Sequence, residues 1–129
     1  MIVLDASAVL ESLLRTPAGL VIDKRIFSQE ILHAPHLLDL EVTQVLRRYA
    51  RAGQIPTQRC REALEDLRGL RLVRYPHDVL LARIWELRDS LTAYDAAYVA
   101  LAEALDAPLL TRDNRLAAAR GHSARVEVV

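Results

Sequence analysis

The chain has 129 residues, of which 52% are apolar, which is enough for one sizeable hydrophobic core but not for two comfortable domains. Seventeen basic residues balance seventeen acidic ones, so the composition excludes an acidic disordered chain and a uniformly basic nucleic-acid coat protein. Lys24 is the only lysine; every other basic residue is an arginine, whose planar side chain matches a phosphate group.

A single cysteine, Cys60, excludes an intramolecular disulfide and a CxxC zinc or redox motif. The first fifteen residues lack a basic opening and carry Asp5 inside an apolar run, which argues against a signal peptide. No run of roughly 18 uninterrupted apolar residues is long enough to cross a membrane. We therefore expect a soluble, cytoplasmic protein with no membrane association.

The apolar periodicity and the chain breakers divide the sequence into alternating strands and helices. The first half predicts, in order, a strand over 2–4, helices through 8–14 and over 20–30, a strand over 31–34 and helices over 37–52 and 57–67. The second half predicts, in order, a strand over 71–75, helices over 78–88 and 94–105, a strand over 108–111, a helix over 114–120 and a strand over 125–129. No hairpin signal such as Asn-Gly separates the strands, so the pattern indicates a parallel sheet covered on both faces.

Three breakers set the expected boundaries in the first half of the chain. The segment 16–19, which contains Pro17 and Gly19, interrupts the helical pattern of the first helix. Pro35 is expected to stop the strand over 31–34, and Gly53 closes the clearly amphipathic helix over 37–52.

Two acids follow strands directly. Asp5 comes immediately after the first strand, and Asp113 follows the strand over 108–111. Ligands of such sheets bind at the carboxyl ends of the strands, where loops run into helix N-termini. Each acid on its own is equally well explained as a helix N-cap, because a carboxylate there accepts a backbone N–H.

Two further acids lie on helix faces next to the core. Glu41 sits on the shoulder of the apolar stripe of its helix, where the alternative is a boundary residue that reaches water or pairs with Arg48. Asp95 lies in the first turn of the most apolar helix, where the alternative is an acid favoured by the helix dipole. Four oxygen-donor residues that converge on one pocket would suit Mg²⁺ or Mn²⁺ better than zinc, and such metal sites activate water for phosphodiester hydrolysis.

The chain contains, in this order, the stretches VLDASAVL, LLDLEVTQVLRRYARAGQI and LTAYDAAYVALAEALDAPLLTRD. Together they resemble the PIN-domain ribonucleases, and in particular the VapC-type toxins of bacterial toxin–antitoxin pairs, over essentially the whole chain. One departure is Leu116, where many relatives carry an aromatic residue.

The resemblance implies one PIN-like nuclease domain over residues 1–129, with an α/β fold built as a three-layer α/β/α sandwich around a mainly parallel central sheet. It implies an acidic quartet that binds Mg²⁺ or Mn²⁺ for endoribonuclease activity on RNA; matched residue by residue, the quartet is Asp5, Glu41, Asp95 and Asp113. The hydroxyl groups of Ser7 and Thr111 are the expected supporting contacts.

The chemistry of the four acids suggests separate roles. Asp5, Asp95 and Asp113 are expected to be direct or water-bridged metal ligands, and Glu41 a further ligand or the general base. The resemblance also implies a homodimer that is inhibited by a small cognate antitoxin, whose C-terminal segment covers the acidic pocket. The exposed faces of the helices over 20–30 and 37–52 are the expected antitoxin groove.

Several other residues that could belong to a functional site are explained as well or better by a structural role. Arg47, Arg48 and Arg51 follow Glu41 on its helix, and Arg112 and Arg115 flank Asp113. These arginines either contact RNA phosphates or form an ordinary solvated face. His33 and His36 have a spacing seen in zinc sites, but no further ligand pair accompanies them. Inert packing is expected for Cys60, and core packing rather than base stacking for Trp85, Tyr94 and Tyr98.

Two alternatives to a ribonuclease toxin remain at this point. A receiver-like phosphoacceptor domain also places an acid after the first strand, but it normally carries an acidic pair there and a late lysine, whereas Lys24 is the only lysine here. A non-catalytic RNA- or protein-binding module on the same PIN-like fold is disfavoured only by the presence of all four acids.

Overall fold

A computed structural model describes residues 1–28 and 31–129 of the chain. Its five strands form one parallel sheet in the order β3-β2-β1-β4-β5. The strands are β1 Ile2–Leu4, β2 Leu32–Pro35, β3 Leu72–Tyr75, β4 Leu109–Thr111 and β5 Val126–Val128. The predicted parallel sheet is therefore confirmed, and Pro35, expected to stop the second strand, is the last residue of that strand.

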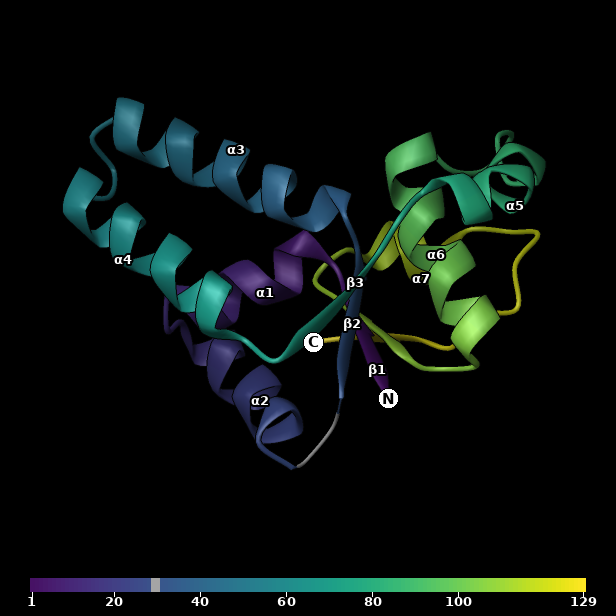
Figure 1. Ribbon diagram of the computed structural model, residues 1–129, viewed down its shortest axis with the longest axis horizontal. Coiled ribbons are helices and arrows are strands. Elements are labelled where there is room, and N and C mark those ends of the chain that lie inside the picture. The colour runs from purple at the N-terminus through teal and green to yellow at the C-terminus, as the bar shows by residue number, and fades with distance from the viewer. Residues whose placement is uncertain (29–30) are drawn as a thin grey trace.

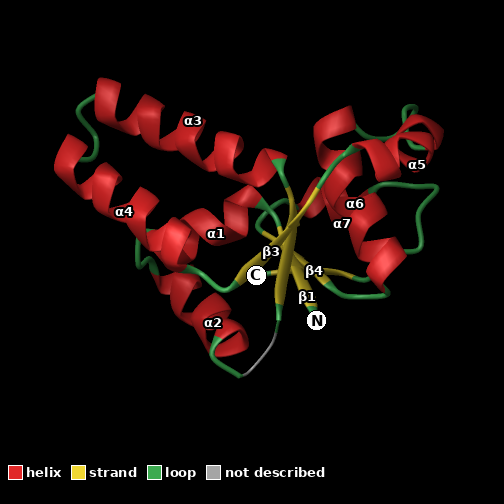
Figure 2. Ribbon diagram, viewed as in Figure 1, coloured by secondary structure: helices red, strands yellow, loops and turns green. Residues whose placement is uncertain are grey.

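The helices lie in two layers on opposite sides of the sheet (Figures 1 and 2). One layer contains α1 Ala6–Leu13, α2 Pro17–Ile26, α3 Leu37–Arg51 and α4 Thr57–Gly69. The other contains α5 Leu81–Glu86, which follows the 3-10 turn η1 Asp78–Leu80, together with α6 Ala93–Leu105 and α7 Asn114–Ala118. The three-layer α/β/α sandwich expected from the resemblance is confirmed. None of the helices within the described residues is long and apolar enough to cross a membrane.

Burial explains why the central elements are so apolar. The three residues of β1 are fully buried, as expected for a strand covered on both faces. The middle of α6, residues 96–102, is buried throughout, and this helix packs on β1, β2 and β4. These buried elements carry two of the acids: Asp5 directly follows β1, and Asp95 lies in the first turn of α6.

The sequence placed the start of the second helix incorrectly. Pro17 does not only interrupt α1; it occupies the first turn of α2, where its missing N–H is not needed, and Thr16 caps the helix by accepting the N–H of Gly19 at 3.1 Å. The helix expected over 20–30 is thus Pro17–Ile26, and residues 29–30 of that expectation lie outside the described residues.

Three later helices differ from their expected lengths. The helix expected over 78–88 is split into η1 and the short α5, a tightening that is common at helix ends. The helix expected over 57–67 continues to Gly69, and the one expected over 114–120 ends at Ala118. The boundary errors fall at helix ends, where short-range signals are weakest.

Gly19 lets α1 and α2 approach closely, and it gives a stability prediction. A Cβ atom at this position would clash with the backbone carbonyl of Glu11 on α1. Because backbone cannot move aside cheaply, Gly19→Ala is expected to lower the free energy of unfolding by about 1–3 kcal/mol. Chemical denaturation followed by circular dichroism measures this loss.

The matched control is Gly69→Ala at the end of α4, where a Cβ would meet nothing within 4 Å. This change is expected to be neutral or to stabilise the helix by up to about 1 kcal/mol. Equal effects of the two substitutions would show that the α1–α2 approach is not the reason for the glycine.

Candidate active site

Asp5 is held in a fixed orientation where β1 ends and α1 begins. Its Oδ1 atom accepts the backbone N–H of Ala8 at 3.0 Å, which caps α1, and accepts the Ser7 hydroxyl at 2.6 Å. The Thr111 hydroxyl donates to Oδ2, and the residue is only 6% exposed. The helix-cap interpretation of Asp5 is therefore confirmed, and the cap leaves its carboxylate in contact with two further hydroxyl groups.

Thr111 and Ser7 connect the carboxyl ends of β1 and β4. The Thr111 hydroxyl, fully buried, accepts the N–H of Asp113 at 2.9 Å while it donates to Asp5. The Ser7 hydroxyl accepts the N–H of Arg112 at 3.0 Å. Both residues predicted to support the acids thus contact Asp5, and they fix the loop that presents Asp113.

Asp113 begins α7 and is paired with an arginine. Its Oδ1 atom accepts the backbone N–H of Arg115 at 2.9 Å, and its Oδ2 atom accepts the guanidinium of the same residue at 2.6 Å. Arg115 was expected, at most, to contact RNA phosphate. Its guanidinium instead lowers the pKa of Asp113 below its ordinary value.

Glu41 points from α3 to an aromatic partner that the sequence did not reveal. The hydroxyl of Tyr98 on α6 donates to Glu41 Oε1 at 2.6 Å, so the partner is Tyr98 rather than Arg48. Tyr98 is 2% exposed, and burial followed by the adjacent Glu41 raises its pKa far above the ordinary value. The available signal was its position three residues after Asp95, on the same face of α6.

Asp95 occupies the third position of α6, half-buried. Its backbone N–H donates to the Thr92 hydroxyl at 3.2 Å, so Thr92 is the helix cap and the carboxylate of Asp95 is not needed for that purpose. A Thr before an apolar run with an acid three residues later is a helix-start signature, and this cap was missed.

The four acids influence one another electrostatically. Burial raises the pKa of Asp5, of Glu41 and of Asp95 above their ordinary values, and the charge of Asp95 raises the first two further. Asp113 in turn raises the pKa of Asp95. We call Asp5, Glu41, Asp95 and Asp113 the acid site, because their charges act on one another; Asp5 and Asp113 follow β1 and β4, and the other two lie on α3 and α6.

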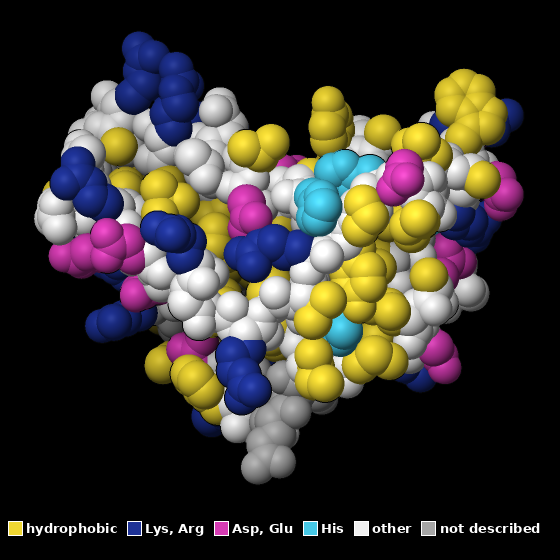
Figure 3. All heavy atoms as spheres, viewed as in Figure 1, with side chains coloured by type: hydrophobic (Ala, Val, Ile, Leu, Met, Phe, Trp, Pro, Cys, Tyr) yellow, Lys and Arg dark blue, Asp and Glu magenta, His cyan; other side chains and the backbone are white. Residues whose placement is uncertain are grey.

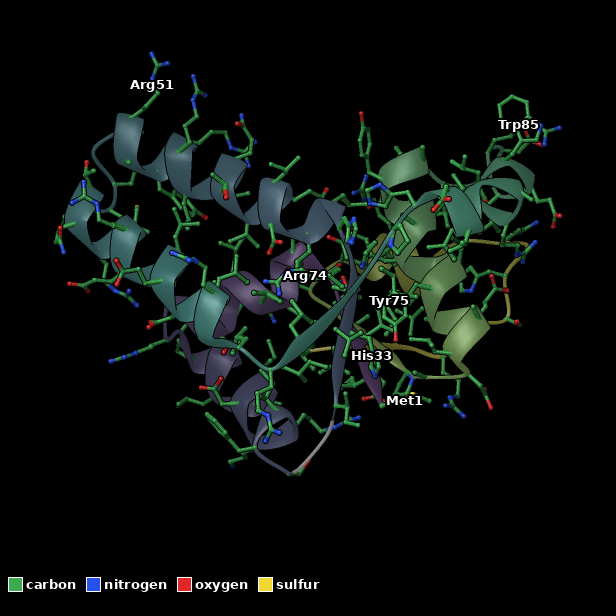
Figure 4. All side chains as sticks on the ribbon, in the orientation of Figure 1. Met1, His33, Arg51, Arg74, Tyr75 and Trp85 are labelled. Carbon is green, nitrogen blue, oxygen red and sulfur yellow. The ribbon has the colours of Figure 1, made fainter. Side chains whose placement is uncertain are left out.

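Direct binding of one metal ion requires side chains that lie closer together than electrostatic coupling does. Within residues 1–28 and 31–129, no three His, Cys, Asp or Glu side chains lie close enough together to hold a metal ion directly. This observation also covers the zinc alternative for His33 and His36. His33 is buried beside Tyr75, whose hydroxyl lies 2.6 Å from Nδ1 (Figure 4), and His36 packs edge-on against His77.

Two further expectations concern packing residues. Cys60 is buried, with its sulfur 3.6 Å from the carbonyl oxygen of Leu46, as inert packing requires. Trp85 and Tyr94, expected in the core, are 68% and 66% exposed, so that prediction is wrong for both. Helical spacing alone placed them inside, but Trp85 on α5 and Tyr94 in the first turn of α6 both lie on exposed sides of their helices.

The raised pKa values predict the pH dependence of stability in the metal-free protein. Asp5, Glu41 and Asp95 have folded pKa values above the ordinary 3.8 and 4.5. Their contribution to stability is therefore fully present below those ordinary values and is lost as the pH rises through the raised ones. Thermal melts in EDTA between about pH 8 and pH 5 should show a melting temperature that rises on acidification.

The effect of pH on the stability contribution of Asp113 has the opposite sign. Its pKa is lowered, so it stabilises the fold at pH values above the ordinary pKa of 3.8 and loses this contribution as the pH falls below that value. A triple variant, Asp5→Asn with Glu41→Gln and Asp95→Asn, is expected to flatten the rise on acidification. A melting temperature that falls steadily from neutrality toward pH 5 in the wild type, and equally in the triple variant, would contradict this assignment.

The fold is an α/β/α sandwich with an all-parallel sheet, and its acid site contains four electrostatically coupled carboxylates. The PIN-domain family model matches residues 2–121. The chain is 44% identical to Ribonuclease VapC1 of Mycobacterium tuberculosis over 128 residues, covering 98% of this chain and 96% of that protein.

Two solved structures share the fold. PAE2754 from Pyrobaculum aerophilum superposes with a TM-score of 0.73 at 28% identity, covering 98% of this chain and 83% of that one. VapBC2 from Rickettsia felis, bound to a DNA fragment from its promoter, gives 0.74 at 12% identity over 100% and 99% of the two chains. The chain belongs to the PIN-domain family, with VapC ribonucleases as its relatives.

Proposed function

We propose that residues 1–129 form a single metal-dependent endoribonuclease domain that acts as the toxin of a type II toxin–antitoxin pair. The observation that carries this proposal is the acid site, in which the carboxylates after β1 and β4 are electrostatically coupled to those of Glu41 on α3 and Asp95 on α6. The full-length similarity to a protein named a ribonuclease supports the same class of reaction.

The donor set of the acid site fits a hard divalent cation. Its members offer only carboxylate oxygens, which suit Mg²⁺ or Mn²⁺. Mg²⁺ keeps several of its waters and is usually bound by only one or two carboxylates, so three acids packed around one ion are not required. Asp5, Glu41, Asp95 and Asp113 would hold the ion, directly or through water, and when bound it would polarise the phosphate and lower the pKa of a water molecule.

The protein groups around the acids prepare them for hydrolysis. Ser7 and Thr111 donate to the two oxygens of Asp5 and fix its orientation, as outer contacts of metal ligands do. Tyr98 donates to Oε1 of Glu41, which leaves Oε2 to accept a proton. A raised pKa brings Glu41 closer to the operating pH, as a general base requires.

In the proposed reaction the water oxygen attacks the RNA phosphorus and its proton passes to Glu41. One P–O bond of the backbone then breaks, and the leaving oxygen takes up a proton to become a hydroxyl group. The products are a terminal phosphate monoester and a free hydroxyl, so the reaction consumes one water and needs no other reactant.

Cleavage of RNA by the purified protein tests this function. The proposal predicts discrete RNA fragments in the presence of Mg²⁺ or Mn²⁺. Binding of RNA without any cleavage, in either metal, would favour the alternative of a non-catalytic RNA- or protein-binding PIN-like module.

We also propose that a small cognate antitoxin binds across α2 and α3 and covers the acid site with a basic segment. An anionic pocket attracts a cationic group. Leu20, Val21 and Phe27 at α2 are 61%, 53% and 80% exposed, which gives such a partner an apolar surface. We propose that a second copy of this chain covers other exposed apolar side chains, those of Val79, Leu81, Trp85 and Tyr94.

Co-expression with the neighbouring small reading frame is expected to give a stable complex and to relieve growth arrest. Leu20→Glu should weaken that complex without lowering the melting temperature, because the side chain is exposed. Val73→Glu, on the exposed part of β3, serves as a control of the same chemistry. Failure to form any complex, together with unrelieved growth arrest, would contradict the antitoxin proposal.

A further inference from the structure

Most arginines with described contacts are used to hold the fold together. Arg25, Arg59, Arg74, Arg83, Arg112 and Arg125 each bind a carboxylate or a carbonyl group of another part of the chain. Arg83 illustrates the pattern, since it binds Glu103 on α6 and the carbonyl of Gly121. These guanidinium groups hold different parts of the fold together.

Of the described arginines without such a contact, three lie together on α3. Arg47, Arg48 and Arg51 are exposed, and within the described part of the chain their guanidinium groups make no ion pair or hydrogen bond. No Asp or Glu occurs between residues 42 and 51 to neutralise them along the helix. We call these three residues the arginine row.

The fold alone explains the arginine row only weakly. Cations near a helix C-terminus gain about 0.3–1 kcal/mol from the helix dipole. Against this, Arg47 and Arg51 are four residues apart, and like charges at that spacing repel each other on a helix surface. A row of this kind is therefore expected where a ligand of opposite charge compensates the repulsion.

The position of the row connects it to the acid site. Arg48 lies seven residues after Glu41 on α3, which brings it to the same face about 10 Å further along the helix, and Arg51 lies about 15 Å along. Basic side chains gather over this far end of α3 (Figure 3), and Arg51 extends away from the body of the protein (Figure 4).

The negative charge of the acid site repels RNA, and the positive charge of the arginine row can offset this repulsion. Carboxylates repel the phosphates of an approaching strand, and the formal net charge of the whole chain is zero, so no general attraction offsets this. Arg115 pairs with Asp113 and also lowers the pKa of Asp95, whereas no cation among the described residues offsets the charges of Asp5 and Glu41. A metal ion in the acid site would offset part of this repulsion there, and cations further along the path of the strand can offset the rest.

We propose that Arg47, Arg48 and Arg51 bind the backbone phosphates of the RNA strand that leads away from the scissile bond. This inference rests on the proposed ribonuclease function and assigns a substrate-binding role to residues outside the acid site. Guanidinium groups match phosphate oxygens in pairs and do not read sequence, so the row binds the strand rather than selecting the cleavage position.

The test compares RNA binding by two variants of equal charge. In one, Arg47, Arg48 and Arg51 are all changed to Gln; in the matched control, the exposed Arg61, Arg68 and Arg71 are changed to Gln. Binding of a short fluorescein-labelled single-stranded RNA is followed by anisotropy in EDTA, to prevent cleavage, at NaCl concentrations from ~50 to ~200 mM. Melting temperatures verify that both variants are folded.

The row variant is expected to bind more weakly than the wild type, and its plot of log affinity against log salt should be shallower by about 0.7 for each lost phosphate contact, or about 2 in all. The control should keep the wild-type slope. In Mg²⁺, the row variant is expected to show a raised KM with little change in kcat, as loss of uniform binding gives.

Two results would overturn the proposal. One is an unchanged salt slope in the row variant, and the other is an equal loss of slope in the control. If the wild type binds RNA through the row but cleaves none in Mg²⁺ or Mn²⁺, the proposed function fails while the arginine row stands.

Discussion

Asp5→Asn, Glu41→Gln and Asp95→Asn are each expected to reduce RNA cleavage by roughly 10²-fold or more, the size of effect typical for loss of a general base. The same changes should leave the melting temperature of the metal-free protein unchanged or raise it. Each of these carboxyls has a raised pKa, which means that its charged form is disfavoured by the folded state. A neutral amide removes that cost and keeps the side-chain shape.

Asp5 is the sharpest case, because it also caps α1. Asn preserves an acceptor for the N–H of Ala8, so the cap survives, whereas Ala would remove it at a cost of about 0.5–2 kcal/mol. Asp113→Asn is expected to change the melting temperature in the opposite direction. It removes the ion pair with Arg115 and should therefore lower the melting temperature slightly. It should also reduce cleavage.

The measurement is a cleavage time course for each variant beside a thermal melt in EDTA. Glu65→Gln on the exposed side of α4 is the matched control and should cut RNA like the wild type. Variants of Asp5, Glu41 or Asp95 that are destabilised yet cut RNA at wild-type rates would assign these acids to the structure and not to the reaction.

Removal of divalent metal is expected to abolish cleavage, and return of Mg²⁺ or Mn²⁺ should restore it. The acid site offers oxygen donors only, and its carboxylates repel each other in the absence of a cation. A cation that binds only the folded state stabilises it by about 2.7 kcal/mol at a concentration of 100 times its Kd. The wild type should therefore melt several degrees higher with saturating Mg²⁺.

The acid variants provide the control for this stabilisation. Asp95→Asn should gain less melting temperature from Mg²⁺ than the wild type, while Glu65→Gln should gain as much. Cleavage that continues undiminished in excess EDTA, or an identical Mg²⁺ effect in Asp95→Asn, would contradict a metal role for the acid site.

The sequence predicted the architecture well because its strongest signals are local. Apolar triplets such as residues 2–4 and the stripe of the helix over 37–52 report burial directly, and the absence of hairpin turns reports parallel pairing. The order of the strands in the sheet depends on contacts between distant segments, such as Val3 with Leu109, which no local pattern encodes.

The site shows the same division between local and long-range information. The positions of Asp5 and Asp113 after strands were readable, and both proved to be helix caps as well. The Tyr98–Glu41 hydrogen bond joins residues 57 positions apart, and burial of Asp5 depends on Thr111, 106 positions away. These contacts shift the pKa values, so the electrostatic character of the site emerged only from the fold.

Hydrolysis at the acid site would place one oxygen atom from solvent on the cleaved phosphate, so cleavage in H₂¹⁸O tests the proposed chemistry most directly. Short RNA products are collected at early times in Mg²⁺ and examined by mass spectrometry, with Asp5→Asn as the control. The expected result is one ¹⁸O atom in each new terminal phosphate and no product from the control. A 2′,3′-cyclic phosphate without ¹⁸O would contradict the account, because the nucleophile would then be the ribose hydroxyl and not a water activated by the acids.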